Sequence, residues 1–162
     1  MADAMTVRRA NRSDRGTLLR FHEALYQQHR DEVLTPEEVS LIAYRDYDRV
    51  LQDDVSALLT DSNACVLLAE NAGEPVGYIT GRLLHEPRRV WPRRGVVEDW
   101  YVLPNYRGRR LGAKLLKAFE EELRKSGCDV LESATWSANE GARRAHEALG
   151  FNEMRVVYRK RL

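Results

Sequence analysis

Residues 96–123, VVEDWYVLPNYRGRRLGAKLLKAFEEEL, hold the features that decide the fold. The first eight of these residues are β-prone and predict a strand that ends before Pro104. A short basic loop that contains glycine comes next. From about Arg110 onward, apolar residues recur at the spacing of an amphipathic helix. A strand, a loop and a helix therefore follow one another without a gap.

The loop between this strand and this helix has the composition of an anion-binding site. The first turn of a helix presents backbone N–H groups without intrahelical partners and carries a partial positive charge. Gly108 and Gly112 let the backbone approach a ligand closely, and Arg107, Arg109 and Arg110 add charge. The loop therefore predicts a ligand that carries phosphate. The alternative is an ordinary strand-to-helix turn with solvated arginines.

Two common nucleotide-binding motifs are not met. No run fits Gly-x-x-x-x-Gly-Lys-Ser/Thr, and the loop has two glycines rather than the three of a dinucleotide-binding turn. The remaining pattern, Val102-x-Pro104-x-x-Arg107-Gly108-x-x-x-Gly112, resembles the pyrophosphate loop of the GNAT superfamily of acyl-CoA-dependent N-acetyltransferases. That loop is Arg/Gln-x-x-Gly-x-Gly/Ala in the superfamily.

The resemblance has one departure and one independent support. Arg110 stands where the loop's first glycine is expected, and we expect the backbone there to tolerate a side chain, as in the first turn of a helix. Further along, Asn139-x-x-Ala142 followed by Leu-Gly-Phe at 149–151 matches the superfamily's other motif in order and distance. The resemblance covers about residues 63–159 and extends more weakly to most of the chain.

Composition limits the classes of function. The length of 162 residues predicts one domain, spanning 1–162. Charged residues make up 31% of the chain but sum to a formal charge of +1, which gives no general electrostatic case for nucleic acid or a membrane surface. No segment approaches the roughly 20 apolar residues of a membrane span, and the polar start lacks the apolar region of a signal peptide. We therefore expect a cytoplasmic protein. Cys65 and Cys128 lack metal-ligand spacing, so we expect neither a disulfide nor a metal site.

The rest of the chain predicts an α/β fold. Strands are expected at 6–10, 65–70, 76–85, 96–103, 129–134 and 151–159, and helices at 14–30, 35–59 in one or two pieces, 110–126 and 139–149. This order suits one mixed sheet with helices on both faces. The resemblance implies a single GNAT-type domain whose sheet is mostly antiparallel. The basic loop at 86–94 is either a solvated connection or a lid that faces an acceptor or a partner.

The resemblance implies that an acetyl group passes directly from acetyl-CoA to an amine, without a metal. The acceptor pocket would be covered by the 35–59 segment, where Tyr44, Asp46, Tyr47 and Asp48 either line it or are exposed helix residues. The implied cofactor contacts come from the strand, the loop, the helix start and the second motif: Trp100, Val102, Arg107, Gly108, Arg109, Arg110, Gly112, Ala113 and Asn139.

Glu98 is the candidate general base. A carboxylate within an apolar strand is costly unless it is paired or used. The matching glutamate is assigned as base, directly or through water, in the polyamine and glucosamine-phosphate acetyltransferases that this segment resembles. Strict alternation places the even-numbered residues 96–102 on one face and the odd-numbered residues 97–103 on the other, unless a bulge intervenes. Asp99 is the alternative carboxylate, and a salt bridge from Glu98 to Arg93 or Arg94 is the non-catalytic alternative.

His146 is the candidate general acid. Many members of the superfamily have a tyrosine seven residues after the motif asparagine, and His146 occupies that position here. Asn139, Ala142 and His146 share one side of a helix. Imidazole titrates near neutrality and could give a proton to the leaving sulfur. The alternative is a surface histidine with no role in the reaction.

The sequence thus predicts an N-acetyltransferase. Segments 97–107 and 133–153 most resemble small-amine, polyamine and aminoglycoside acetyltransferases, but the N-terminal third lacks the tryptophan-rich opening of the aminoglycoside enzymes. A small primary amine of the polyamine kind is the first choice of acceptor, ahead of an aminoglycoside and of a peptide or protein amine. A non-catalytic module that binds acetyl-CoA is the alternative of another class. The sequence leaves the option of a homodimer open.

Overall fold

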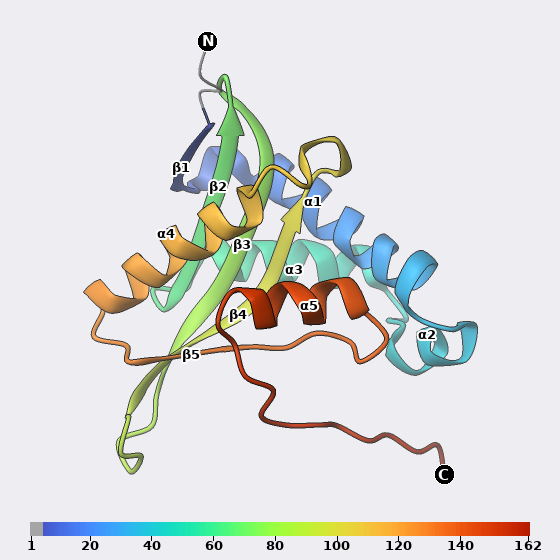
Figure 1. Ribbon diagram of the computed structural model, residues 1–162. Coiled ribbons are helices and arrows are strands. Elements are labelled where there is room, and N and C mark those ends of the chain that lie inside the picture. Colours follow the sequence, from blue (N-terminus) through green and yellow to red (C-terminus); the bar gives the residue numbers. More distant parts are fainter. Residues whose placement is uncertain (1–4) are drawn as a thin grey trace.

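A five-stranded sheet runs through the centre of residues 5–162, the part of the chain that the computed structural model describes (Figure 1). Its strands lie in the order β1-β2-β3-β4-β5. They are β1 (Met5–Arg9), β2 (Ala64–Asn71), β3 (Glu74–His85), β4 (Arg93–Val102) and β5 (Val130–Ser133). Neighbours from β1 to β4 pair antiparallel, whereas β4 and β5 pair parallel.

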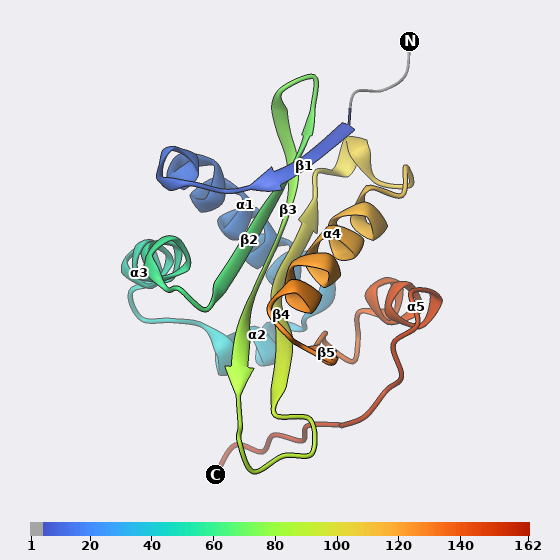
Figure 2. The same cartoon turned by 90° about the vertical axis from the view of Figure 1, so that its left-hand side faces the viewer.

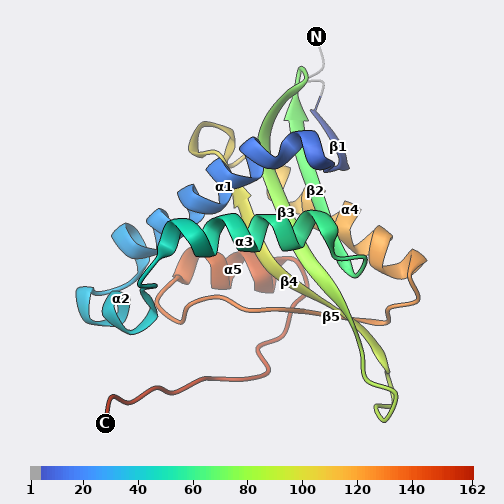
Figure 3. The ribbon, with the colours of Figure 1, turned by 180° about the vertical axis from the view of Figure 1, so that it is seen from behind.

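Helices cover both faces of this sheet (Figure 2). They are α1 (Arg15–Gln28), which continues into a π-helical turn (His29–Val33), α2 (Pro36–Ile42), α3 (Tyr47–Thr60), α4 (Leu111–Lys125) and α5 (Glu140–Ala148). Helices α1 and α3 lie on one side, and α4 and α5 lie on the other; Figure 3 shows α1 and α3 crossing the strands from behind. The predicted mixed, mostly antiparallel sheet with helices on both faces is confirmed.

The strand β2 shows why the sheet must be covered on both sides. Its side chains alternate, with Cys65, Leu67 and Ala69 in the cluster under α4 and Val66 and Leu68 in the cluster under α1 and α3. All five are at most 7% exposed. A strand that is apolar in both directions is stable only between two layers of helices.

The described residues show neither a membrane-spanning segment nor a metal cluster. No helix within 5–162 is long and apolar enough to cross a membrane. Over the same range, no group of three or more His, Cys, Asp or Glu side chains is placed to hold a metal ion. Cys65 and Cys128 are buried free thiols, and burial raises the pKa of Cys65 to about 11.

The strand predicted at 151–159 is wrong, because the chain after α5 forms no regular structure. The segment passes below α5 toward α2, where the Arg159 guanidinium donates to the Leu41 carbonyl oxygen at 3.1 Å (Figure 1). Met154, Val157 and Tyr158 are 91%, 75% and 92% exposed. A β-prone segment needs a strand to pair with, and this one does not run along the short edge strand β5.

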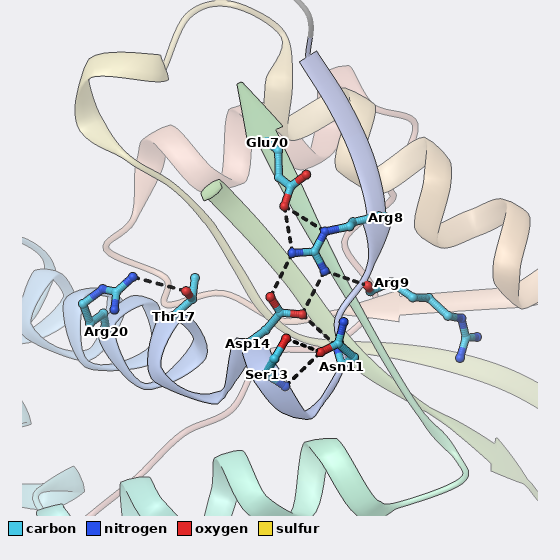
Figure 4. A network of polar contacts seen from close by, with 8 residues as sticks. All are labelled: Arg8, Arg9, Asn11, Ser13, Asp14, Thr17, Arg20 and Glu70. Atoms are coloured by element: carbon cyan, nitrogen blue, oxygen red, sulfur yellow. Dashed lines mark hydrogen bonds and ion pairs between the residues drawn. The ribbon is translucent and has the colours of Figure 1, made fainter. Parts of the chain in front are cut away.

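A network of ionic hydrogen bonds ties β1 to β2 and to the start of α1 (Figure 4). The Arg8 guanidinium donates to both carboxylate oxygens of Asp14 at 2.8 Å and, through Nε, to Glu70 at 2.8 Å. The Asn11 backbone N–H also donates to Asp14 at 2.8 Å. The bond from Arg8 holds the pKa of Asp14 below its usual value, although burial opposes that shift.

We expect Asp14→Asn to lower the free energy of unfolding by about 2 kcal/mol at neutral pH, because Arg8 then loses a charged, nearly buried partner. A group with a depressed folded-state pKa stabilises the fold above its unfolded-state pKa and ceases to do so as pH falls through the folded-state value. The difference between wild type and variant, measured by urea denaturation, should therefore shrink below about pH 4. Asp53→Asn, at an exposed pair with Arg49, is the control. An equal loss in both variants would contradict the assignment.

Candidate functional site

A β-bulge in β4 organises the site. Thr80 pairs with Asp99 and Gly81 pairs with Val97, so Glu98 is an extra residue opposite β3. A Cβ at Gly81 would overlap the Val96 carbonyl oxygen and lie 2.6 Å from the Phe119 ring, so only glycine allows this approach. The bulge brings two consecutive carboxylates, Glu98 and Asp99, to the wall of one pocket.

The bulge also corrects the predicted alternation of β4. Val97 lies in the cluster under α4 and Tyr101 in the cluster under α1 and α3, although both are odd-numbered. Trp100 packs against the α4 cluster. One extra residue shifts the alternation by one. Before the bulge, odd-numbered residues of β4 face α4, and after the bulge even-numbered residues do.

The pocket beside the bulge has a volume of about 350 Å³. Helices α1 and α3, the segment between α2 and α3, and strands β3 and β4 contribute its walls: His22, Leu25, Tyr26, His29, Tyr44, Tyr47, Val50, Asp54, Leu58, Arg82, Glu98 and Asp99. Tyr44 and Tyr47 lie in the wall of this pocket, which is one of the two placements that the sequence left open for them. Asp46 instead caps α3 by accepting from the Arg49 N–H, and Asp48 is not part of the wall.

Asp99 is held by groups from two other elements. Its Oδ2 accepts from the Thr80 hydroxyl at 3.0 Å and lies 3.3 Å from Nδ1 of His22. Nε2 of His22 lies 3.7 Å from Oδ2 of Asp54. Burial lowers the pKa of His22, but the hydrogen bond and charge of Asp99 and the charge of Asp54 outweigh burial and raise it overall. Sequence reasoning missed His22, Asp54 and Thr80, which no motif marks.

Glu98 is paired, although not with either arginine expected from the sequence. Nε of Arg82 donates to Glu98 at 2.9 Å, and the same guanidinium donates to Asp61 at 3.1 Å. Burial raises the pKa of Glu98 and the negative charge of Asp99 adds to this, while the charge of Arg82 opposes it. Arg94 instead pairs with Glu132 and Glu86, and Arg93 donates to the Ser126 carbonyl oxygen.

Three tyrosines line the same pocket as these carboxylates. The rings of Tyr26 and Tyr47 stack with centroids 4.1 Å apart, and Tyr44 lies 6.3 Å from Tyr26. The Tyr47 hydroxyl oxygen is buried and makes no hydrogen bond with the described residues. A pocket lined by both aromatic rings and carboxylates suits a cationic ligand.

The loop before α4 leaves helical N–H groups free. Lys114 donates the first bond of the helix, to the Arg110 carbonyl oxygen at 3.0 Å, and the N–H groups of 111–113 have no backbone partner among residues 5–162. Gly108 has φ = +76° with open space around it. Arg110 has φ = +59° and ψ = +16°, so it is left-handed. The expected helical first-turn conformation at Arg110 is wrong; a left-handed side-chain residue costs about 1 kcal/mol.

The arginines of this loop differ in their surroundings. Nε of Arg107 donates to the Val102 carbonyl oxygen at 2.8 Å and its Nη2 donates to Gln28 at 2.9 Å, so Arg107 fixes the loop to β4 and α1. The Arg109 guanidinium lies 5.5 Å from the centre of the Tyr106 ring. Arg109 and Arg110 are exposed.

Strands β4 and β5 separate beside this loop. Their pairing ends at Val97 and Ser133, whereas β4 continues to Val102 with its β5 side unpaired by the described strands. Trp100 lies under the first turn of α4, where a Cβ at Gly112 would be 3.5 Å from its Nε1. Ala113 is half-buried in the same turn. The open side of β4 thus leads to the free N–H groups of α4.

His146 and Asn139 lie on α5 and at its start, beside this gap. Nδ1 of His146 donates to the Ala142 carbonyl oxygen at 2.6 Å, and Nε2 lies 2.7 Å from the Ser133 hydroxyl. The imidazole contacts the Trp100 ring with centroids 5.6 Å apart. Asn139 caps the helix, accepting from the Ala142 N–H at 3.1 Å. Neither side chain lines the pocket at the bulge.

Comparison with known proteins shows which family the chain belongs to. The model of the acetyltransferase (GNAT) family matches residues 19–151. An aminoglycoside N(6')-acetyltransferase type 1 from Stenotrophomonas maltophilia is 36% identical over 110 residues, 65% of this chain and 72% of that protein. A thialysine N-epsilon-acetyltransferase from Bos taurus is 28% identical over 155 residues, 91% of this chain and 84% of that protein.

A solved structure supports the fold. The aminoglycoside N-acetyltransferase AAC(6')-Iy in complex with CoA matches with a TM-score of 0.78 over 100% of this chain and 98% of that one, at 23% identity. That likeness concerns the fold, and the family follows from the sequence matches. This protein is an N-acetyltransferase of the GNAT family.

Proposed function

We propose that this enzyme transfers the acetyl group of acetyl-CoA to a primary amine of a small, multiply cationic molecule. The pocket at the β4 bulge carries this proposal, because Asp54, Glu98 and Asp99 face it together with three tyrosines. Such a site attracts positive charge and binds it over aromatic rings. A polyamine-like chain is the first choice of acceptor. The reaction would take place in the cytoplasm, where acetyl-CoA is available, and a homodimer stays a prediction.

Acetyl-CoA fits the second half of the site. The free N–H groups of 111–113 and the open backbone at Gly108 offer donors to a pyrophosphate, and Arg109 and Arg110 add exposed charge. The unpaired side of β4 between 98 and 102 leads from that loop toward the bulge. The side chains of Arg107 and Asn139 are engaged within the protein, so we assign them to shaping the site.

Glu98 is our candidate for the group that takes the proton of the attacking amine. Its raised pKa brings a carboxylate closer to the range in which a general base works best. Asp99 remains the alternative, although its Oδ2 already accepts from Thr80 and faces His22. His146 is the candidate proton donor to the leaving sulfur. A proton on Nε2 would require the imidazolium form, because Nδ1–H already donates to Ala142.

A second acceptor class has support of its own. The relative from Stenotrophomonas maltophilia carries the name of an aminoglycoside 6'-acetyltransferase, and the aminoglycosides are also multiply cationic amines. A peptide amine and a non-catalytic acetyl-CoA-binding module are the remaining alternatives. The departures that motivate the last one are Arg110 and the absence of the family tyrosine at position 146.

Thiol release from acetyl-CoA over a panel of amines tests the function. We expect turnover with diamines and polyamines, with aminoglycosides next, and weaker turnover with neutral amino sugars or peptides. Release that needs both protein and amine, with an acetylated product seen by mass spectrometry, would support the proposal. Tight acetyl-CoA binding without turnover on any amine would instead favour the binding module.

Glu98→Gln should reduce kcat by about 10²–10⁴-fold, the usual worth of a placed general base, while acetyl-CoA affinity changes little. Glu86→Gln is the matched control, since that carboxylate pairs with Arg89 and Arg94 outside the pocket wall. Steady-state kinetics and calorimetry check both statements. Activity of Glu98→Gln within a few-fold of wild type would move the role to Asp99 or to water.

His146→Phe should lose turnover without losing acetyl-CoA binding, because it removes the proton donor and keeps a ring against Trp100. His146→Tyr should recover part of the rate, with the falling limb of the pH–rate profile moved upward, because a phenol gives up its proton at a higher pH than an imidazolium does. Thermal melting separates a loss of stability from a loss of chemistry. Normal turnover by the phenylalanine variant would leave His146 a purely structural role.

A further inference from the structure

His22 occupies a special position in the pocket, between two carboxylates. Nδ1 faces Asp99 at 3.3 Å and Nε2 faces Asp54 at 3.7 Å. The imidazole is 17% exposed and Asp99 is 19% exposed, whereas Asp54 is 53% exposed at the outer side. The Tyr78 hydroxyl lies 3.4 Å from Nδ1. The chemistry assigned above does not use His22.

His22 shares the pocket with several other titratable or charged side chains, and the arginine among them already has carboxylate partners. The titratable or charged side chains around His22 are Tyr26 from α1, His29 from the π-helical turn that follows it, Tyr44 from the segment before α3, Tyr47 and Asp54 from α3, Tyr78 and Arg82 from β3, and Glu98 and Asp99 from β4. Arg82 is the single permanently cationic residue in the described wall, and it pairs with Asp61 and Glu98. A protonated His22 is therefore the internal cation of Asp54 and Asp99.

Protonation of His22 changes what the pocket offers a ligand. With a neutral imidazole, Asp54 and Asp99 present two negative charges without a cationic partner of their own. With an imidazolium, both carboxylates face an internal positive charge. An external ammonium group that approaches the same carboxylates must then share them with His22, which weakens its binding.

We propose that Asp54 and Asp99 form a subsite for a second ammonium group of the acceptor, and that protonated His22 competes with that group as a built-in cation. This inference rests on the proposed function, which places the reacting amine beside Glu98. It assigns the enzyme an acceptor with at least two amino groups. It also makes the affinity for that acceptor depend on pH, while the acetyl-CoA half of the site takes no part.

The direction of the pH effect follows from the charges. The neighbouring carboxylates raise the pKa of His22, so the imidazolium persists to higher pH than in a free histidine. The KM of a diamine should fall about tenfold as pH rises through that pKa. The KM of a monoamine should show little of this fall. Binding is reciprocal, so a bound diamine must lower the pKa of His22.

Kinetics with 1,4-diaminobutane and butylamine between pH 5.5 and 8.5 test the proposal. His22→Gln is always neutral and should give a diamine-to-monoamine KM ratio that no longer changes with pH. His22→Lys keeps a permanent cation and should hold that ratio at the unfavourable low-pH value throughout. His85→Gln and His85→Lys make the same changes at an exposed site of β3 outside the pocket wall and should behave as wild type.

Two further measurements keep the test decisive. Asp54→Asn should remove most of the preference for the diamine even if a His22 variant fails to fold. An NMR titration of His22 with and without 1,4-diaminobutane should show the pKa lowered by the diamine, and not by butylamine. An unmoved pKa, or a KM ratio in His22→Gln that still follows pH, overturns the subsite.

Failure of the proposed function gives a different result. Wild-type protein would then turn over no amine, and calorimetry with the same two amines and variants would still measure the subsite. Diamine binding that depends on pH through His22, without turnover, would support the subsite and reject the catalytic proposal. Equal binding of both amines at every pH, by a protein that does turn over amines, would reject the subsite alone.

Discussion

The extra residue in β4 is the constraint on which the site depends. Without the bulge, Glu98 and Asp99 would point to opposite faces, and one of the two carboxylates would enter the apolar layer under α4. The bulge places both in the pocket and keeps Val97 and Trp100 under α4. Burying a carboxylate in that layer would cost several kcal/mol. Gly81 makes the arrangement feasible, since a side chain there would overlap the Val96 carbonyl oxygen.

The two carboxylates that the bulge brings together, Glu98 and Asp99, repel each other, so each needs a partner that stabilises its negative charge. Each has a different partner: Arg82 for Glu98, Thr80 and His22 for Asp99. Adjacent like charges raise each other's pKa, whereas a hydrogen-bond donor or a cation lowers it. The pocket thus holds Glu98, a carboxylate whose pKa is raised, beside Asp99, a carboxylate that accepts from Thr80 and faces His22.

Sequence patterns predicted the features that depend on neighbouring residues along the chain. They did not predict the features that depend on contacts with other strands and helices. The strand, loop and helix of 96–123 follow from residues that contact one another along the chain, and so do the paired helices of 35–59. Which face each residue of β4 occupies depends on the bulge opposite Gly81 of another strand. The pocket depends on His22 and Asp54 from separate helices. Neither feature could therefore be predicted from the sequence of β4 alone. The segment expected to form a strand at 151–159 has β-prone residues but does not run along β5, the edge strand of the described sheet.

Arg110 shows how the anion loop tolerates a departure from the family pattern. Its left-handed backbone is the conformation that a glycine adopts most easily, so the chain takes a glycine-like conformation at this position although the residue is an arginine. The cost of about 1 kcal/mol is small beside the stability of a domain. In exchange, a positive charge stands immediately before the free N–H groups of α4. Under the proposed function, a loop that lacks one glycine can still offer its N–H groups to a phosphate, because the backbone conformation, and not the glycine itself, decides where those groups point.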